Sequence, residues 1–125
     1  MGDSFSDYLI ETLNKGSIAL MLSIGHRTRL FDILSTMRPS TVEEISKKAN
    51  LNQRYVEEWL GTMITGKIIA YDSSNTFNLP KEKAQFLTRE NNIYNTSASM
   101  QWIPILAQVE DKIVECFNRG GGVSY

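Results

Sequence analysis

Hydrophobic residues recur at helical spacing along the first part of the chain. Their spacing predicts a helix from Ser6 to about Gly25, where the glycine is a stop. These residues are Tyr8, Leu9, Leu13, Ile18, Leu20, Met21, Leu22 and Ile24. Gly16 weakens the middle of this helix, because glycine is a poor helix former. A second helix is predicted from about Thr28 to Met37, and Pro39 ends it by holding the preceding residue away from helical geometry.

The next stretch, STVEEISKKANLNQRYVEEWLGTMITG, predicts two short helices joined by a tight turn. Two overlapping capping boxes open the first of them, Ser40 with Glu43 and Thr41 with Glu44. This helix ends by Lys48, and the letters ANLN form the turn.

Asn52 is placed to cap the following helix, whose apolar positions share one face. Those positions are Tyr55, Val56, Trp59, Leu60 and Met63. Gly66 fits a left-handed stop at its C-terminal end. Two helices joined in this way are typical of a helix-turn-helix.

Two apolar runs, residues 68–71 and 76–79, then flank a turn-prone segment at residues 72–75 and predict a β-hairpin wing. Pro80 begins a segment that predicts one or two helical turns. A last helix is expected from near Ser97 to Phe117, starting or kinking at Pro104. Its apolar stripe steps by three or four residues. The stripe consists of Trp102, Leu106, Val109, Ile113 and Phe117.

These elements predict a mostly α fold: a winged helix-turn-helix with a small β-hairpin wing and a long C-terminal helix. The 125 residues are enough for one modest core. We therefore expect a winged-helix domain over residues 1–118. The glycines at 120–122 end regular structure, so residues 119–125 are interpreted as a hinge toward a catalytic domain that this chain does not include.

Composition narrows the functional classes. The formal charge of −1 gives no overall field that would attract phosphate backbones. The single cysteine, Cys116, excludes an internal disulfide and a thiolate zinc site, which favours a reducing compartment such as the cytoplasm. The sequence shows no secretory leader and no apolar run long enough for a membrane. Gly2 with Ser6 matches the short myristoylation pattern, although Asp3 does not favour it.

A helix-turn-helix raises the question of DNA binding. The DNA-facing set would be Lys47, Lys48, Gln53 and Arg54, since these side chain types contact bases and phosphates. Glu57 and Glu58 oppose that role, and the wing tip DSSN carries one acid and no base. Because phosphate neutralisation supplies most of the non-specific affinity, the charges favour a use other than DNA binding.

Enzymatic sites have little support. His26 is the only histidine and is interpreted as a solvated residue at a helix end. Cys116 lies beside the apolar stripe and is interpreted as a buried or half-buried apolar residue, because no histidine is near it in sequence. The adjacent glutamate pairs are interpreted as helix caps and solvated helix faces. They are Glu43 with Glu44 and Glu57 with Glu58. We predict no catalytic, cofactor-binding or metal-binding residue in this chain.

The helix-turn-helix, the phrase RYVEEWL, the wing and the closing FNRGGGVSY together resemble the N-terminal winged-helix domain of class I S-adenosylmethionine-dependent methyltransferases of the small-molecule type. The likeness covers the chain from about Leu13 onward. Two positions depart from it: Arg29 stands where such sequences tend to carry glycine, and Ser124 replaces a common proline. They affect local helix-end and linker geometry.

The resemblance implies a non-catalytic module that supports dimerisation and caps the substrate pocket. It implies S-adenosylmethionine as cofactor of a full-length relative and none in this chain. The apolar stripe would contact either a second copy or a catalytic domain, although it could also pack on the first helix of its own domain. The alternative function is a winged-helix transcription regulator.

Overall fold

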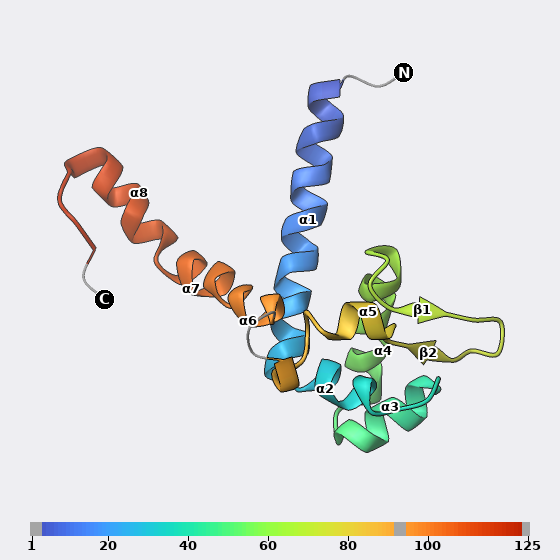
Figure 1. The fold of residues 1–125 in the computed structure, drawn as a ribbon. Helices are drawn as coiled ribbons and strands as arrows, with labels where there is room; N and C mark the ends of the chain where they lie inside the picture. Colours follow the sequence, from blue (N-terminus) through green and yellow to red (C-terminus); the bar gives the residue numbers. More distant parts are fainter. Residues whose placement is uncertain (1–3, 92–94, 124–125) are drawn as a thin grey trace.

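The computed structural model describes residues 4–91 and 95–123; Gly2, Asp3 and Ser124, named above, lie outside them. Figure 1 shows a small helical body with a two-stranded wing, from which α1 (Ser4–Arg27) projects as a long rod. After α1 come α2 (Leu30–Ser35), α3 (Val42–Ala49) and α4 (Gln53–Thr65). The wing is β1 (Ala70–Tyr71) paired antiparallel with β2 (Phe77–Asn78), with Tyr71 opposite Phe77. The predicted winged helix-turn-helix is confirmed.

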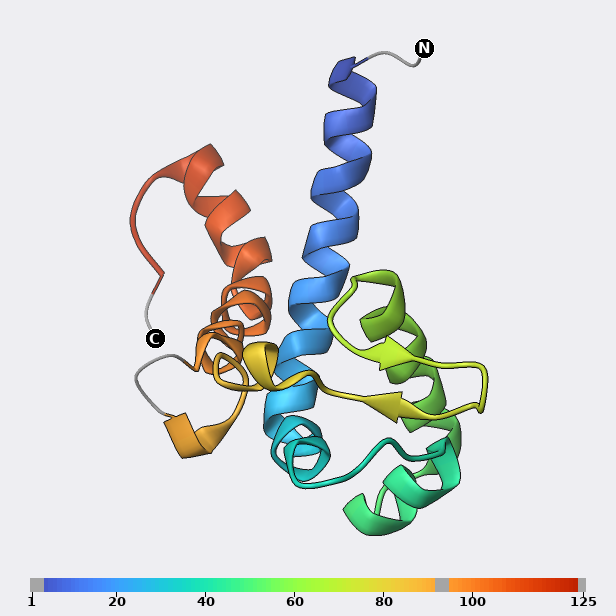
Figure 2. The ribbon, with the colours of Figure 1, turned by 45° about the vertical axis from the view of Figure 1, so that its right-hand side comes forward.

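The chain then passes through α5 (Lys81–Ala84) and a 3₁₀ turn (Arg89–Asn91) to three short helices. These are α6 (Thr96–Ser99), α7 (Trp102–Gln108) and α8 (Glu110–Arg119). In the two views of Figures 1 and 2, α6 lies against the C-terminal part of α1, and α7 and α8 lead away from the body. The molecule therefore has a compact body and two helical arms.

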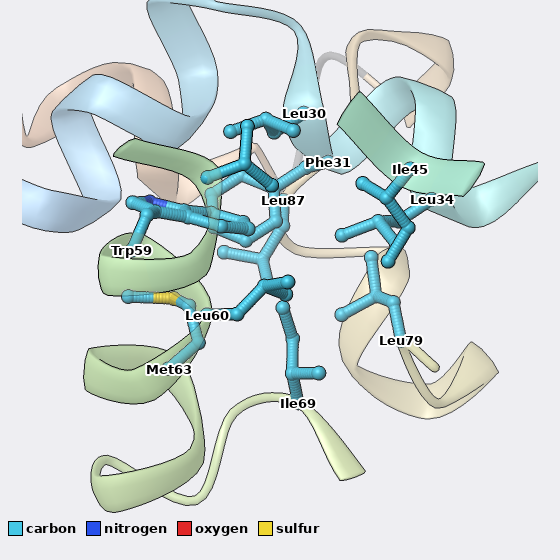
Figure 3. Packing of buried hydrophobic residues seen from close by; sticks show 11 residues of the cluster. Leu30, Phe31, Leu34, Ile45, Trp59, Leu60, Met63, Ile69, Leu79 and Leu87 are labelled. Carbon is cyan, nitrogen blue, oxygen red and sulfur yellow. The ribbon is translucent and has the colours of Figure 1, made fainter. Parts of the chain in front are cut away.

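The core lies where α2, α3, α4 and the wing meet (Figure 3). Its side chains are apolar and almost fully buried, and they come from elements far apart in the sequence. They are Leu30, Phe31, Leu34, Ile45, Val56, Trp59, Leu60, Met63, Ile69, Leu79 and Leu87. The predicted face of α4 supplies four of them, while Tyr55 of that face is exposed.

Caps define both helices of the helix-turn-helix. Thr41 and Glu44 form the capping box: the Thr41 hydroxyl accepts from the Glu44 N–H, and Glu44 Oε1 accepts from the Thr41 N–H at 2.9 Å. The predicted Ser40 box does not form, because buried Ser40 pairs its backbone with Phe77 of the wing. Asn52 caps α4 as predicted, accepting from two backbone N–H groups.

Two predicted helix boundaries and one predicted helix-end conformation were wrong. The first helix does not stop at Gly25 but continues to Arg27, and the second begins at Leu30 because Arg29 takes a left-handed conformation with φ 65°. A residue in the left-handed conformation ends helical hydrogen bonding, and glycine adopts this conformation at the least cost. This explains why similar sequences tend to carry glycine at position 29, where this chain has arginine. At the end of α4, Lys67 with φ 61° takes the left-handed position predicted for Gly66.

The predicted last helix, Ser97 to Phe117, is broken into α6, α7 and α8. The first break follows from Pro104, which has no N–H to donate to the Met100 carbonyl; the Ile103 N–H donates to that carbonyl instead. The second lies at Val109, whose N–H bonds three residues back to Leu106. Pro104 therefore sits in the first turn of α7, after a break.

A close contact fixes α1 on the body. Gly25 faces the rings of Phe31 and Trp59, and a Cβ at this position would lie 2.5 Å from Phe31 Cε2 and 2.6 Å from Trp59 Cζ2. The two rings pack on each other at 5.2 Å between centroids. Trp59 Nε1 donates to the carbonyl of Met21 at 2.8 Å, which adds a polar bond between α4 and α1. Only glycine allows this approach.

Arg89 links the C-terminal end of α1 to α2. Arg89 forms an ion pair with Asp32 and donates from Nη2 to the carbonyl of His26 at 2.6 Å, while its backbone N–H bonds Asp32 at 2.7 Å. His26 is only 9% exposed, and its Nδ1 is buried without a hydrogen-bond partner. The expectation of a solvated histidine was therefore wrong: the chain packs the end of α1 against residue 89, far along the sequence.

We predict that Gly25→Ala destabilises the fold although alanine favours helix, because the added methyl group overlaps two buried rings. The free energy of unfolding should fall by about 1–3 kcal/mol. Gly61→Ala in α4 is the matched control, since a Cβ there meets nothing within 4 Å. The control should gain up to about 1 kcal/mol. Urea unfolding followed by circular dichroism measures both; equal effects would contradict the packing argument.

The stability of the fold should also fall on acidification. Burial, and next the charge of Arg89, lower the pKa of His26 below its usual 6.5. The unfolded chain then binds the proton more readily, so the stabilisation is complete above pH 6.5 and is lost as pH falls through the lower folded-state pKa. We expect the urea midpoint to drop between about pH 7.5 and pH 5.5. His26→Gln should have a flatter pH profile, and an unchanged slope would refute this assignment.

Candidate interaction surface

The predicted stripe on the C-terminal helices is largely exposed. Trp102 is 65% exposed and Phe117 is 88% exposed, and Leu106 and Ile113 are exposed too, while Val109 is half-buried at the break between α7 and α8. Although α7 contacts α1 at its base, none of the five residues belongs to the buried core. Packing on this domain's own first helix therefore leaves most of the stripe uncovered.

A second exposed apolar surface lies on α1. The N-terminal part of the rod stands clear of the body in both views (Figures 1 and 2). Its large exposed side chains are Phe5, Tyr8, Leu9, Ile10, Leu13, Leu20 and Ile24. The sequence pattern predicted the helix but not this exposure, because periodicity alone does not say which apolar face the body covers. One hint was present in the sequence: the predicted helix, from Ser6 to about Gly25, is long for so small a core.

Most of the large exposed apolar side chains lie on the two arms. Single exposed apolar residues are ordinary on a monomer surface, but so many on a few helices are not. Contiguous apolar patches of this kind mark interaction sites. Aromatic residues stand at their ends, Phe5 on α1 and Trp102 and Phe117 on α7 and α8. The candidate functional surface therefore consists of the exposed apolar side chains of α1, α7 and α8.

The residues considered for DNA contact lie on the helix-turn-helix as predicted, and all four are exposed. Lys47 and Lys48 occupy the last turn of α3. Gln53 donates to Glu43 at 3.3 Å, and Arg54 forms an ion pair with Glu58 at 3.8 Å. Both polar groups at the start of α4 are thus already engaged by acidic side chains of the same surface.

The hollow between α3, α4 and the wing is acidic. It is lined by Thr41, Val42, Glu43, Glu57, Tyr71, Ser74, Asn75 and Phe77. Nearby, the Thr41 backbone N–H and hydroxyl lower the pKa of Glu44, and bonds from Thr76 and Ser74 lower the pKa of Asp72. These carboxylates remain ionised at neutral pH. The face that a winged helix would turn to DNA therefore carries negative charge where phosphates would lie.

Within residues 4–91 and 95–123, no three histidine, cysteine, aspartate or glutamate side chains lie close enough to hold a metal ion. Cys116 is half-buried, as expected, in a shallow groove where the glycine-containing segment turns back along α8. That groove is lined by Lys112, Glu115, Arg119, Gly120, Gly122 and Val123 besides the cysteine. In the part of the chain that the structure describes, none of the helices has the length and apolar character needed to cross a membrane.

Three solved structures share the fold of this chain. Human N-acetylserotonin methyltransferase in complex with SAM matches with a TM-score of 0.73 at 15% identity, over 92% of this chain and 36% of that one. PigF with SAH matches with a TM-score of 0.71 at 15% identity, over 87% and 33%. The O-methyltransferase NcsB1 from neocarzinostatin biosynthesis, in complex with S-adenosyl-L-homocysteine, matches with a TM-score of 0.53 at 14% identity, over 69% and 26%.

At these identities the likeness shows the fold, and the chain spans about a third of the length of the first two structures. No curated protein sequence matches the chain. The model of the Rv2258c-like winged HTH domain matches residues 16–89, more than half of the chain and the part that holds the core, the helix-turn-helix and the wing. The chain therefore belongs to the Rv2258c-like winged HTH domain family.

Proposed function

We propose that this chain is the non-catalytic N-terminal module of an S-adenosylmethionine-dependent methyltransferase, acting in dimerisation and in capping the substrate pocket. The fold supports this, since it is shared with two solved methyltransferases, of which the match covers 36% and 26% of the chain. The observation that carries the proposal is the set of exposed apolar side chains on α7 and α8, which the body of the domain does not cover.

In this proposal the cofactor and the methyl acceptor bind to another part of the enzyme. Our chain contributes packing surface and rigidity, and the glycines at 120 and 121, both at positive φ, provide the hinge toward the catalytic domain. Residues 1–118 form the module in this view. A reducing cytoplasm suits a protein whose one cysteine is unpaired.

The first contact that we assign to the α7–α8 surface is a second copy of the chain. A soluble protein gains roughly 25 cal/mol for each Å² of apolar surface removed from water, and aromatic residues are the usual anchors of protein interfaces. Trp102 and Phe117 are the largest exposed side chains of the stripe. The alternative occupant, a methyltransferase catalytic domain, is an outcome that the test below separates.

DNA binding is the competing function, and the charges oppose it. The four candidate side chains share their surface with Glu43, Glu57 and Glu58, two of which already bind Gln53 and Arg54. We therefore expect no shift of a random-sequence duplex in low-salt buffer. Binding that weakens steeply with added salt would overturn the methyltransferase-module proposal in favour of a transcription regulator.

Light scattering of the purified chain at several concentrations tests the dimer. We expect Trp102→Gln and Ile113→Gln each to weaken dimerisation at least tenfold, or about 1.4 kcal/mol, because each places a polar group in an apolar contact. Circular dichroism should remain native, since both side chains are exposed in the single chain.

Tyr55→Gln is the control variant, because Tyr55 is an equally exposed aromatic residue on α4, away from the stripe. It should dimerise like the wild type. If the wild type dimerises but neither stripe variant weakens the dimer, the stripe is not part of the dimer contact. Retention of the chain by a separately expressed methyltransferase catalytic domain, lost in the same two variants, would then assign the stripe to that domain.

A further inference from the structure

A regular apolar stripe runs along the full length of α1. Its members step by 4, 4, 3, 4 and 4 residues and are Phe5, Leu9, Leu13, Gly16, Leu20 and Ile24. The five large side chains are between 42% and 72% exposed. On the helical wheel the stripe lies opposite Ile18, Leu22 and Gly25, which face the body. The stripe therefore stays open even where α1 is anchored.

Gly16 is the unexplained member of this stripe. Glycine is the least favourable residue in a helix interior apart from proline, and a Cβ at Gly16 would meet nothing within 4 Å. Gly25, in the same helix, has its reason in the rings of Phe31 and Trp59. No packing among the residues that the structure describes accounts for Gly16, whereas a close approach from another molecule would account for it.

The stripe is complementary to itself when two copies of α1 run antiparallel. In one register Phe5 lies opposite Ile24, Leu9 opposite Leu20, and Leu13 opposite Gly16, and the same pairs repeat on the other side of the two-fold axis. Each large side chain then meets an apolar partner, and the leucine at position 13 fills the space that the glycine leaves open.

A parallel pair is less complementary. It would place Gly16 opposite Gly16, with Leu13 opposite Leu13 and Leu20 opposite Leu20, so the seam would be narrow at its centre and wide on either side. It would also bring Asp7 and Glu11 of both copies to the same end. The antiparallel pair separates these like charges and opposes the helix dipoles.

We propose that two copies of the chain associate through an antiparallel contact of their α1 helices, in which Leu13 of each copy packs over Gly16 of the other. This inference rests on the dimerisation in the proposed function and adds a second contact to the one assigned there to α7 and α8. The rod is the right length for such a pairing, since 24 helical residues span about 36 Å. Its C-terminal end is fixed to the body by hydrogen bonds from Trp59 and Arg89.

Gly16→Leu tests the close approach. In a single chain the new side chain has open space, so the fold should be kept. In the dimer it would meet Leu13 of the other copy, and we expect dimerisation measured by sedimentation equilibrium to weaken at least tenfold. Gly61→Leu is the matched control, an exposed helical glycine on α4 with equally open surroundings, and it should dimerise like the wild type.

Cross-linking tests the orientation. With Cys116→Ser as background, Leu9→Cys and Leu20→Cys are prepared separately and then mixed with a short bis-maleimide. The antiparallel register places position 9 opposite position 20, whereas positions 9 and 9 are about 16 Å apart along the axis. We expect a cross-linked dimer in the mixture and little in either variant alone.

The outcomes separate this inference from the proposed function. A dimer that Gly16→Leu leaves unchanged, or that Gly61→Leu weakens equally, overturns the α1 contact while the module proposal stands. Self-cross-linking of Leu9→Cys alone overturns the antiparallel orientation. A wild-type chain that is monomeric at every concentration overturns both the α1 contact and the proposed dimerisation.

Discussion

The contact of Gly25 with the rings of Phe31 and Trp59 determines how the rest of the molecule is arranged. It lets α1 pass close enough to α4 for Trp59 Nε1 to reach the Met21 carbonyl, and it sets the direction of the rod. The clasp of Arg89 on Asp32 and on the His26 carbonyl secures the same end. Because one end of α1 is fixed by a glycine, two aromatic rings and an arginine, its other end is presented to solvent in a defined place.

This rigid projection explains why so small a domain exposes so many large apolar residues. The core is formed by α2, α3, α4 and the wing, and only the C-terminal end of α1 helps to cover it, through Met21, Leu22 and Gly25. Neither α7 nor α8 contains a buried residue. The residues of α1 beyond the body and those of α7 and α8 therefore contribute little buried apolar surface to the single chain. A helix without tertiary packing is marginal in water, and this agrees with the proposed contacts of both arms with another molecule.

The domain has the fold of a DNA-binding winged helix, but carboxylates lie on the surface that such a domain turns to DNA. Carboxylates line the hollow beside the wing, and hydrogen bonds from Thr41, Thr76 and Ser74 keep Glu44 and Asp72 ionised. Those same bonds hold the capping box and the wing turn in place. The groups that stabilise the fold thus also repel phosphate, and a protein-binding role for the domain agrees with both facts.

The sequence by itself determined the local elements. Hydrophobic periodicity and the caps at Thr41 and Asn52 predicted the helix-turn-helix, and the runs around residues 72–75 predicted the wing, because these features depend on neighbours within a few positions. It also identified the α7–α8 stripe. Tertiary structure decided what periodicity cannot see: that Gly25 is a contact and not a stop, that His26 is buried by a residue 63 positions away, and that the outer part of α1 is bare. Burial depends on which segments meet in space, and one face of a helix looks the same in sequence whether the chain's own core or another molecule covers it.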